Sequence, residues 1–203
     1  HIGYNLDNID FFYTLGVRIM QLTYNMMNLV GVGTTEKYER EAGLSYFGLR
    51  FVERLNKLGI LVDTGHCGAK TTLDAVEASK APIAATHTAC RAVYNYPRAK
   101  SDEVIKAIAE KGGYIGIYAV PFFYPPEDRT MNHLLDEIDH AVEIAGIDHV
   151  GIGTDYGGQM GPWPDEIKET LNEAMKQGWA EIGFRSEHGV DPRLAVEGVE
   201  VFR

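Results

Sequence analysis

Short apolar runs alternate with amphipathic stretches along most of this chain. β-Favouring runs occupy residues 18–24, 59–66, 82–89, 113–120 and 148–155. Amphipathic, helix-favouring stretches occupy residues 43–59, 69–80, 101–112 and 131–146. A strand–helix–strand order repeated this often predicts parallel strands joined by right-handed crossovers. The sequence therefore predicts an α/β fold, either an open doubly wound sheet or a closed (β/α) barrel.

The predicted helices carry signals for where helices begin and end. Stretch 101–112 places four apolar side chains on one face, and Ser101 is a suitable N-cap. Gly112 and Gly146 suit the position after a helix, where the backbone is often left-handed. No GxGxxG motif follows a predicted strand, which disfavours a dinucleotide-binding version of the fold.

The composition limits the classes of protein to which the chain can belong. It has 203 residues, of which 45% are hydrophobic, enough for one substantial core. We therefore expect a single domain over residues 1–203. The formal net charge of −10 argues against nucleic acid and an anionic membrane surface as partners. No apolar run reaches transmembrane length. The compartment is left open, with the cytoplasm expected for a bacterial protein without a leader.

Polar residues that can carry chemistry close three of the apolar runs. His66 ends the second run, His87 lies at the close of the third, and Asp155 ends the fifth. In both parallel-sheet architectures, functional sites collect at the carboxyl ends of the strands, where the connecting loops form a crevice. We therefore predict a functional site built on these three residues.

The two histidines suggest a shared metal ion. Consecutive parallel strands joined by one helix are usually neighbours, about 4.8 Å apart. Imidazoles at equivalent heights on such strands can converge on one metal, with nitrogens at about 2.0–2.1 Å from it. The alternative, that His66 and His87 are ordinary core histidines, stays open for either residue alone.

Asp155 is the candidate acid/base group. A carboxylate at the end of this strand can take a proton from a metal-bound water, whose pKa the metal lowers to about 7. Gly151 and Gly153 lie on the same face of the run, and we expect them to leave room for a ligand or water. A role in capping the next helix or ordering the turn is the alternative.

Several other residues are weaker candidates. Arg98 can clamp a substrate carboxylate in bidentate fashion, although a surface arginine has the same spacing. Tyr24 and Asn25, at the end of the first run, can donate hydrogen bonds to substrate. Asp63 can form a supporting hydrogen bond near the site, although strand alternation points it away from His66.

The two cysteines, one loop and the other histidines are weaker evidence for a functional site. Cys67 and Cys90 follow the site histidines, but a nucleophilic Cys–His pair would leave Asp155 unexplained. The Pro-rich loop 121–130 suits either a substrate cover or an ordinary connection. We expect the other histidines on helices and loops to face solvent: His133, His140, His149 and His188.

Four segments of the chain are RIMQLTYNMMNLVG, GLSYFGLRFVERLNKLGILVDTGHCG, PIAATHTACRAVYNYPR and DHVGIGTDYGG. In this order, they resemble the membrane (renal-type) dipeptidase family of the amidohydrolase superfamily. The resemblance covers roughly residues 14–158. It implies a (β/α)8 barrel with two zinc ions, of which this chain supplies about strands four to eight.

The resemblance also implies roles for single residues. His66 and His87 match two ligands of one zinc, and Asp155 matches the aspartate that handles the proton of the bridging water. Arg98 matches the arginine that holds the dipeptide carboxylate. Tyr24 falls where vertebrate members carry a substrate-binding histidine.

The sequence departs from the family pattern at three places. Ala99 stands where an asparagine is usual, and Gly157 stands where a second aspartate is usual. The family's His-x-Asp pair and bridging glutamate for the other zinc have no match. We therefore expect the chain to be an internal segment, incomplete at both ends and inactive alone.

The leading hypothesis is a zinc-dependent dipeptidase in which a metal-bound hydroxide attacks the peptide bond of a small peptide with a free carboxylate. Another amidohydrolase activity, such as N-acyl amino acid deacylation or lactone hydrolysis, is the enzymatic alternative. A non-catalytic ligand-binding homologue is the alternative from another class. The sequence leaves a homodimer open.

Overall fold

The computed structural model describes residues 2–36, 42–120, 123–125 and 128–155. Within these residues, five strands form one parallel sheet in the order β1-β2-β3-β4-β5. The strands are β1 (Ile19–Gln21), β2 (Leu61–Asp63), β3 (Ala84–Thr88), β4 (Tyr114–Ile117) and β5 (Val150–Ile152). Each strand lies inside a run predicted from the sequence, and each pairs with its neighbour along the chain. The predicted α/β fold is confirmed.

Helices form a layer along the sheet. They are α1 (Asp7–Thr14), α2 (Tyr46–Leu58), α3 (Ala69–Ala78), α4 (Asp102–Glu110) and α5 (Met131–Ala145), with a short 3₁₀ turn, η2 (Ile147–His149), before β5. The helices α2 to α5 were predicted, whereas α1 was not. None of the helices in the described ranges is long and apolar enough to cross a membrane.

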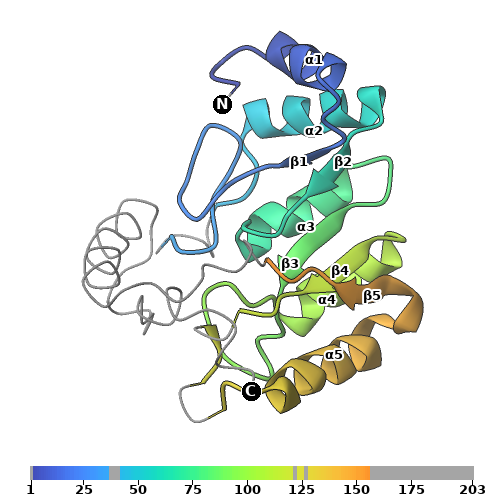
Figure 1. Ribbon diagram of the computed structural model, residues 1–203. Coiled ribbons are helices and arrows are strands. Elements are labelled where there is room, and N and C mark those ends of the chain that lie inside the picture. The colour runs from blue at the N-terminus through green and yellow to red at the C-terminus, as the bar shows by residue number, and fades with distance from the viewer. Residues whose placement is uncertain (1, 37–41, 121–122, 126–127, 156–203) are drawn as a thin grey trace, which may run out of the picture.

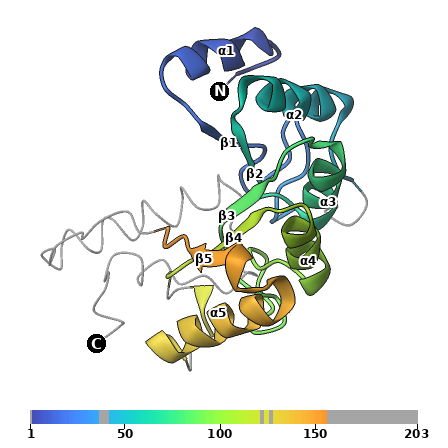
Figure 2. The same cartoon turned by 90° about the vertical axis from the view of Figure 1, so that its right-hand side faces the viewer.

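The order of the strands separates the two architectures that the sequence left open. Figures 1 and 2 show α2, α3 and α4 side by side along the sheet, and α5 packs against α4. A doubly wound sheet reverses its strand order and so places helices on both faces. Here the order never reverses, so crossovers of one hand leave the helices on one side. This is the arrangement of a barrel segment.

Local signals in α2 show why these residues form this layer. The Ser45 side chain accepts a hydrogen bond from the Gly48 backbone N–H at the start of the helix. Gly59 ends it with φ of 69°, a left-handed conformation that glycine adopts without a Cβ penalty. The buried side chains recur at helical spacing and face the sheet. They and the strand residues form the core: Phe51, Val52, Leu55, Val62, Ile83 and Ala85.

The strands are shorter than the apolar runs, and this changes where the site residues lie. β2 ends at Asp63, so His66 lies in the turn three residues later. β5 ends at Ile152, so Asp155 likewise follows its strand. His87, in contrast, lies inside β3. The two site histidines therefore lie on different elements, His66 in a turn and His87 in a strand.

A β-bulge interrupts β3 at the position of His87. Ala85 pairs with Ile115 and Thr88 with Ile117, so one extra residue lies on the β3 side. Bulges re-aim side chains and are frequent next to functional sites. The bulge therefore changes the alternation that a regular strand would impose on Thr86 and His87.

Three glycines leave space for protein atoms rather than for a ligand. A Cβ on Gly116 or on Gly153 would overlap the Thr86 carbonyl oxygen, and one on Gly151 would collide with the Tyr114 hydroxyl. The prediction that Gly151 and Gly153 leave room for a ligand was wrong. Their missing side chains instead accommodate the bulged backbone of β3 and the Tyr114 ring.

Candidate active site

The two predicted metal ligands lie next to each other at the carboxyl ends of β2 and β3. The ring centres of His66 and His87 are 4.8 Å apart, with 57° between the ring planes. His66 is only 5% exposed, and His87 is half-buried. Two imidazoles bound to one zinc through nitrogens at about 2.0–2.1 Å need ring centres roughly 5 Å apart. The separation therefore suits a shared metal ion.

His66 is held by residues from the loop after β1. Its Nδ1 lies 2.6 Å from Oδ1 of Asn25, whose side chain is fully buried. The Tyr24 ring stacks on the His66 ring, with centres 4.2 Å apart and 23° between planes. Tyr24 is 48% exposed, so its ring covers one face of His66 while part of the side chain remains accessible. Asn25, predicted to contact substrate, instead lies behind His66.

The turn that carries His66 is tied to distant parts of the chain through its backbone. The Thr34 N–H donates to the His66 carbonyl oxygen at 2.9 Å. Lys100, only 4% exposed, donates from Nζ to the carbonyl oxygens of Thr64 and Cys67, at 2.8 and 2.6 Å. These bonds fix the turn on both sides of His66, although no regular strand extends that far.

His87 is held by a chain of hydrogen bonds that ends on Asp63. Its Nδ1 lies 2.8 Å from the Thr86 hydroxyl oxygen, which donates its proton to Asp63 Oδ2 at 2.9 Å. Asp63 Oδ1 accepts from the backbone N–H groups of Thr86 and Gly65, at 2.9 and 3.0 Å. Asp63 therefore serves His87, the histidine on the neighbouring strand.

The surroundings keep both histidines neutral. Burial, followed by the positive charges of Arg98 and a smaller effect of Lys100, lowers the pKa of His66. Burial also lowers the pKa of His87, with Arg98 adding to the effect, while Asp155 and Asp63 partly oppose it. A neutral imidazole has a free nitrogen lone pair, which a metal ligand requires. The pair thus fits a divalent metal in protonation state as well as in spacing.

Arg98 lies between the turn of His66 and the end of β3. It is fully buried, and its terminal amino groups donate to the carbonyl oxygens of Gly65 and His87, the latter at 3.2 Å. Its Nε has no hydrogen-bond partner. No carboxylate of the described residues pairs with it, and burial lowers its pKa. The site thus contains a desolvated positive charge whose Nε donor is unused.

Asp155 lies beyond the end of β5 with an exposed side chain. It is the one non-glycine residue with positive φ, 56°, within the described part of the chain. Aspartate tolerates this conformation better than most residues, but it still costs free energy relative to the usual regions. The charge of Asp155 acts on Tyr24, His87 and Arg98. The carboxylate is therefore close enough to influence the histidine pair.

The two cysteines are unsuited to nucleophilic catalysis. Both thiols are buried, and burial raises the pKa of Cys67 and of Cys90. Sγ of Cys67 accepts a hydrogen bond from the Thr23 hydroxyl, and Sγ of Cys90 donates to the Glu137 carbonyl oxygen. Because the thiolate is the reactive form, this environment disfavours the Cys–His alternative.

The other histidines do not extend the candidate site. His133 is 4% exposed, so the prediction that it faces solvent was wrong: it lies near Asp128 and Glu137 on the inner face of α5. His140 pairs with Asp102, and His188 lies outside the described residues. Among the described residues, no group of three or more His, Cys, Asp or Glu is arranged to hold a metal. The described residues therefore bring together the two histidines and no larger set of potential metal ligands.

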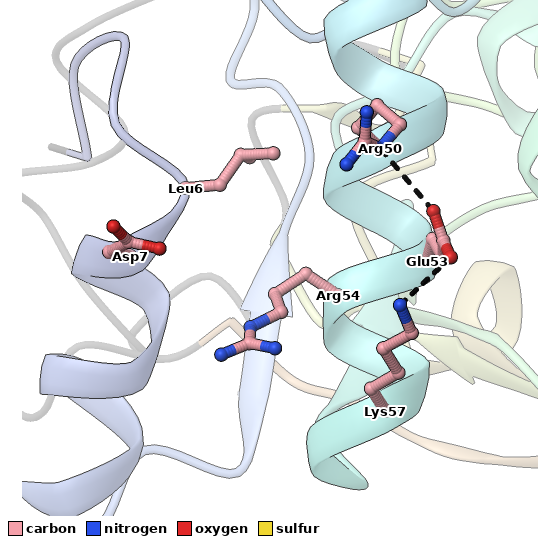
Figure 3. Close-up of a pocket in the computed structure, with 6 residues that line it drawn as sticks. All are labelled: Leu6, Asp7, Arg50, Glu53, Arg54 and Lys57. Atoms are coloured by element: carbon pink, nitrogen blue, oxygen red, sulfur yellow. Dashed lines mark ion pairs between the residues drawn. The ribbon is translucent and has the colours of Figure 1, made fainter.

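Two hollows of the described residues are not lined by the histidine pair. The first, about 240 Å³, lies between α1 and α2, and Figure 3 shows Arg50 and Lys57 both directed at Glu53. Arg54 of the same hollow pairs with Asp10 of α1. The positive side chains of this hollow are thus paired with carboxylates of α1 and α2. The second hollow, about 530 Å³, follows the edge of β1 and reaches Tyr24.

The parallel sheet with helices on one side, and the paired histidines at its carboxyl end, are typical of the (β/α)-barrel class of proteins. Residues 1–184 match the family Membrane dipeptidase (Peptidase family M19). The chain therefore belongs to this family, and the expected (β/α)8 barrel, of which these five strands are a part, is confirmed.

Individual relatives agree with this assignment. The dipeptidase verJ of Clonostachys rogersoniana is 29% identical over 196 residues, which cover 93% of this chain and 50% of that protein. An amidohydrolase of Pseudomonas aeruginosa has a TM-score of 0.74 at 30% identity, over 98% of this chain and 64% of that one. A metallo peptidase of Rhodobacter sphaeroides, liganded with a phosphinate mimic of the dipeptide L-Ala-D-Ala, shares the fold with a TM-score of 0.71 at 24% identity. That match covers 96% of this chain and 59% of the Rhodobacter chain. The chain thus spans about half the length of the curated relative.

Proposed function

We propose that the protein containing this chain is a zinc-dependent dipeptidase, which hydrolyses the peptide bond of a dipeptide with an activated water molecule. Membership of the membrane dipeptidase family and the similarity to a named dipeptidase support this reaction. In the proposal, His66 and His87 are ligands of one of two zinc ions. Further ligands come from outside the described residues.

The histidine pair is the observation that carries the proposal. Two neutral imidazoles with centres 4.8 Å apart meet at the end of a parallel sheet where barrel enzymes have their active sites. Both Nδ1 atoms already have hydrogen-bond partners, so Nε2 is the nitrogen left on each ring for a metal. This combination of spacing, charge and orientation fits zinc better than it fits two unrelated core histidines.

The exposed carboxylate of Asp155 is the proposed proton carrier. Zinc, when bound, polarises the peptide carbonyl and lowers the pKa of a water molecule. Asp155 acts electrostatically on His87 and has no hydrogen-bond partner within the described residues. Its free carboxylate is thus suited to take a proton from the attacking water and return it to the leaving amine. Tyr24, half-exposed on the face of His66, is suited to contact the substrate.

Arg98 supports a substrate with a free carboxylate. A fully buried guanidinium without a counter-ion is costly, because the desolvation of the charge is not offset by pairing. A substrate carboxylate would supply that counter-ion, and Nε of Arg98 is an unused donor for it. An N-acyl amino acid carries the same carboxylate as a dipeptide. The dipeptidase relative favours the dipeptide, whereas a lactone would leave Arg98 unpaired.

The metal content of the full-length protein is the first test. We expect about two zinc ions per chain, with one lost in His66→Ala and in His87→Ala. His140→Ala is the matched control, because His140 pairs with Asp102 away from the site and its loss leaves the zinc content unchanged. Hydrolytic activity in a preparation stripped of metal would rule out the proposed mechanism.

The substrate is tested by pairing each dipeptide with its C-terminal amide. If Arg98 binds the carboxylate, Arg98→Ala raises KM for the dipeptide far more than for the amide, and Arg98→Lys restores part of the loss. N-acyl amino acids and lactones tested in parallel separate the alternative hydrolases. Equal effects of Arg98→Ala on a dipeptide and its amide would remove Arg98 from substrate binding.

A further inference from the structure

Each site histidine meets a polar partner at Nδ1, and the two partners differ in kind. Asn25 Oδ1 lies 2.6 Å from Nδ1 of His66, and the Thr86 hydroxyl, backed by Asp63, lies 2.8 Å from Nδ1 of His87. We propose that Asn25 and the Asp63–Thr86 pair are positioning residues that keep the proton on Nδ1 of each ring and so present Nε2 as the ligand atom. The consequence for zinc rests on the proposed function; the proton placement does not.

The partner of His66 is an oxygen that can only accept. With the Asn25 amide in this orientation, its oxygen offers lone pairs and no proton, so Nδ1 of His66 carries the hydrogen of this bond. Asn25 is fully buried, which leaves no water in competition for Nδ1. Its own backbone is fixed, because its carbonyl oxygen accepts from the Thr35 N–H at 3.0 Å and from the Thr35 hydroxyl at 2.9 Å.

The partner of His87 is a hydroxyl whose only proton is already committed. Thr86 donates to Asp63 Oδ2 at 2.9 Å, so its oxygen has only lone pairs left for His87. The remaining Asp63 oxygen accepts from two backbone N–H groups, those of Gly65 and Thr86, which fixes the orientation of the carboxylate. The chain therefore runs in one direction, from the His87 ring through Thr86 to Asp63.

The direction of this chain depends on Asp63 being a carboxylate. In Asp63→Asn, the amide oxygen must keep the Oδ1 position, because two backbone N–H groups donate to it. The amide nitrogen then takes the Oδ2 position and donates to the Thr86 oxygen. The freed Thr86 proton turns to Nδ1 of His87, which becomes an acceptor. The substitution thus keeps every hydrogen bond, but it exchanges donor and acceptor between residue 63 and Thr86 and between Thr86 and His87. This exchange moves the ring proton of His87 to Nε2.

The test is the histidine tautomer in the metal-free, full-length protein, measured by nitrogen-15 NMR of labelled histidines. In the wild type we expect Nδ1–H for His66 and His87. Asp63→Asn is expected to move the His87 proton to Nε2, leave His66 unchanged and leave the melting temperature close to that of the wild type. Zinc affinity, measured by chelator competition, falls by about 10–100-fold.

Matched variants separate the proposed positioning of the histidine rings from a general disturbance of the fold. Thr86→Ser keeps the hydroxyl and is expected to retain the Nδ1–H form of His87, whereas Thr86→Val removes it and gives mixed tautomers. Asn25→Asp keeps an acceptor at the same place and retains Nδ1–H on His66. Asn25→Leu removes the acceptor and weakens zinc binding by the same 10–100-fold range.

The outcomes distinguish this inference from the function on which it builds. If Asp63→Asn leaves the proton of His87 on Nδ1, or Asn25→Asp moves that of His66, the positioning role is overturned. If the tautomers respond as expected but the wild-type protein binds no zinc, the positioning role stands and the proposed function fails.

Discussion

The two site histidines are supported in opposite ways. His87 lies inside β3, where a bulge and the neighbouring strands fix its backbone. His66 lies three residues beyond β2, in a turn held by side chains and backbone groups from the loop after β1 and from Lys100. Their outer partners differ as well, since a carboxylate stands behind His87 and a neutral amide behind His66.

This difference shows how a barrel can bring two histidine side chains together although only one of them lies inside a strand. The sheet supplies the position of His87 through its hydrogen-bond ladder. The position of His66 is supplied by Asn25 and Lys100, which are distant in sequence, through contacts that cross between loops. A substitution in the sheet should therefore damage the fold together with His87, whereas a substitution in the loops should damage His66 more selectively.

Gly153→Ala should have the largest effect, and it acts on the support of His87. Its Cβ would overlap the Thr86 carbonyl oxygen, a backbone atom of the bulge that cannot move without breaking the sheet. We expect a loss of about 3 kcal/mol in the free energy of unfolding, near the upper end for overpacking of a core. Denaturant unfolding of the full-length protein measures it.

Gly59→Ala is the matched control for this prediction. Gly59 has φ of 69° but open space where a Cβ would go, so only backbone strain is added. That strain costs about 1–2 kcal/mol for a left-handed alanine. A loss in Gly153→Ala no greater than in Gly59→Ala would mean that β5 shifts easily and that the glycine is not needed to accommodate the bulge.

Lys100→Met tests the support of His66 and should have a smaller effect on stability. Methionine fills similar space but cannot donate to the carbonyl oxygens of Thr64 and Cys67. Losing bonds from a charged donor is expected to cost about 2 kcal/mol. In the full-length protein, we expect the NMR signals of His66 to broaden or shift while those of His87 change little.

The control for Lys100→Met is Lys106→Met, which removes an exposed lysine beside Glu110 on α4. Exposed pairs of this kind contribute little, so neither stability nor the His66 signals should change. Equal disturbance of both histidines in Lys100→Met would contradict the separate supports proposed for the two rings.

Sequence reasoning located the strands and the two histidines because both are set by local pattern. Apolar runs of strand length mark β2 and β3, and His66 and His87 are where those runs turn polar. Strand alternation also predicted that the Asp63 side chain points away from His66. Fold class followed from the order of elements, which needs no long-range detail.

The rest depended on contacts that no local pattern records. The bulge at His87 arises from an offset between β3 and β4, and Gly153, just after β5, accommodates it. Asn25 looked like a substrate residue because it follows a strand, but the loop after β1 folds back and buries it behind His66. His133 looked exposed because polar residues surround it in α5, yet it lies on the buried face.

Gly65→Ala should have the smallest effect on stability and tests whether the two supports are independent. Gly65 belongs to the turn of His66, but its Cβ would lie 2.9 Å from Cε1 and 3.0 Å from Nδ1 of the His87 ring. The His87 ring cannot turn away freely, because Nδ1 is bound to Thr86. We expect about 1 kcal/mol of destabilisation, as for mild overpacking. Zinc binding should weaken and the NMR signals of His87 should shift, while those of His66 stay unchanged.

If zinc affinity and the His87 signals in Gly65→Ala both match the wild type, the His87 ring has more freedom than its bond to Thr86 implies. The proposal that β3 fixes His87 more firmly than the loop contacts fix His66 would then fail.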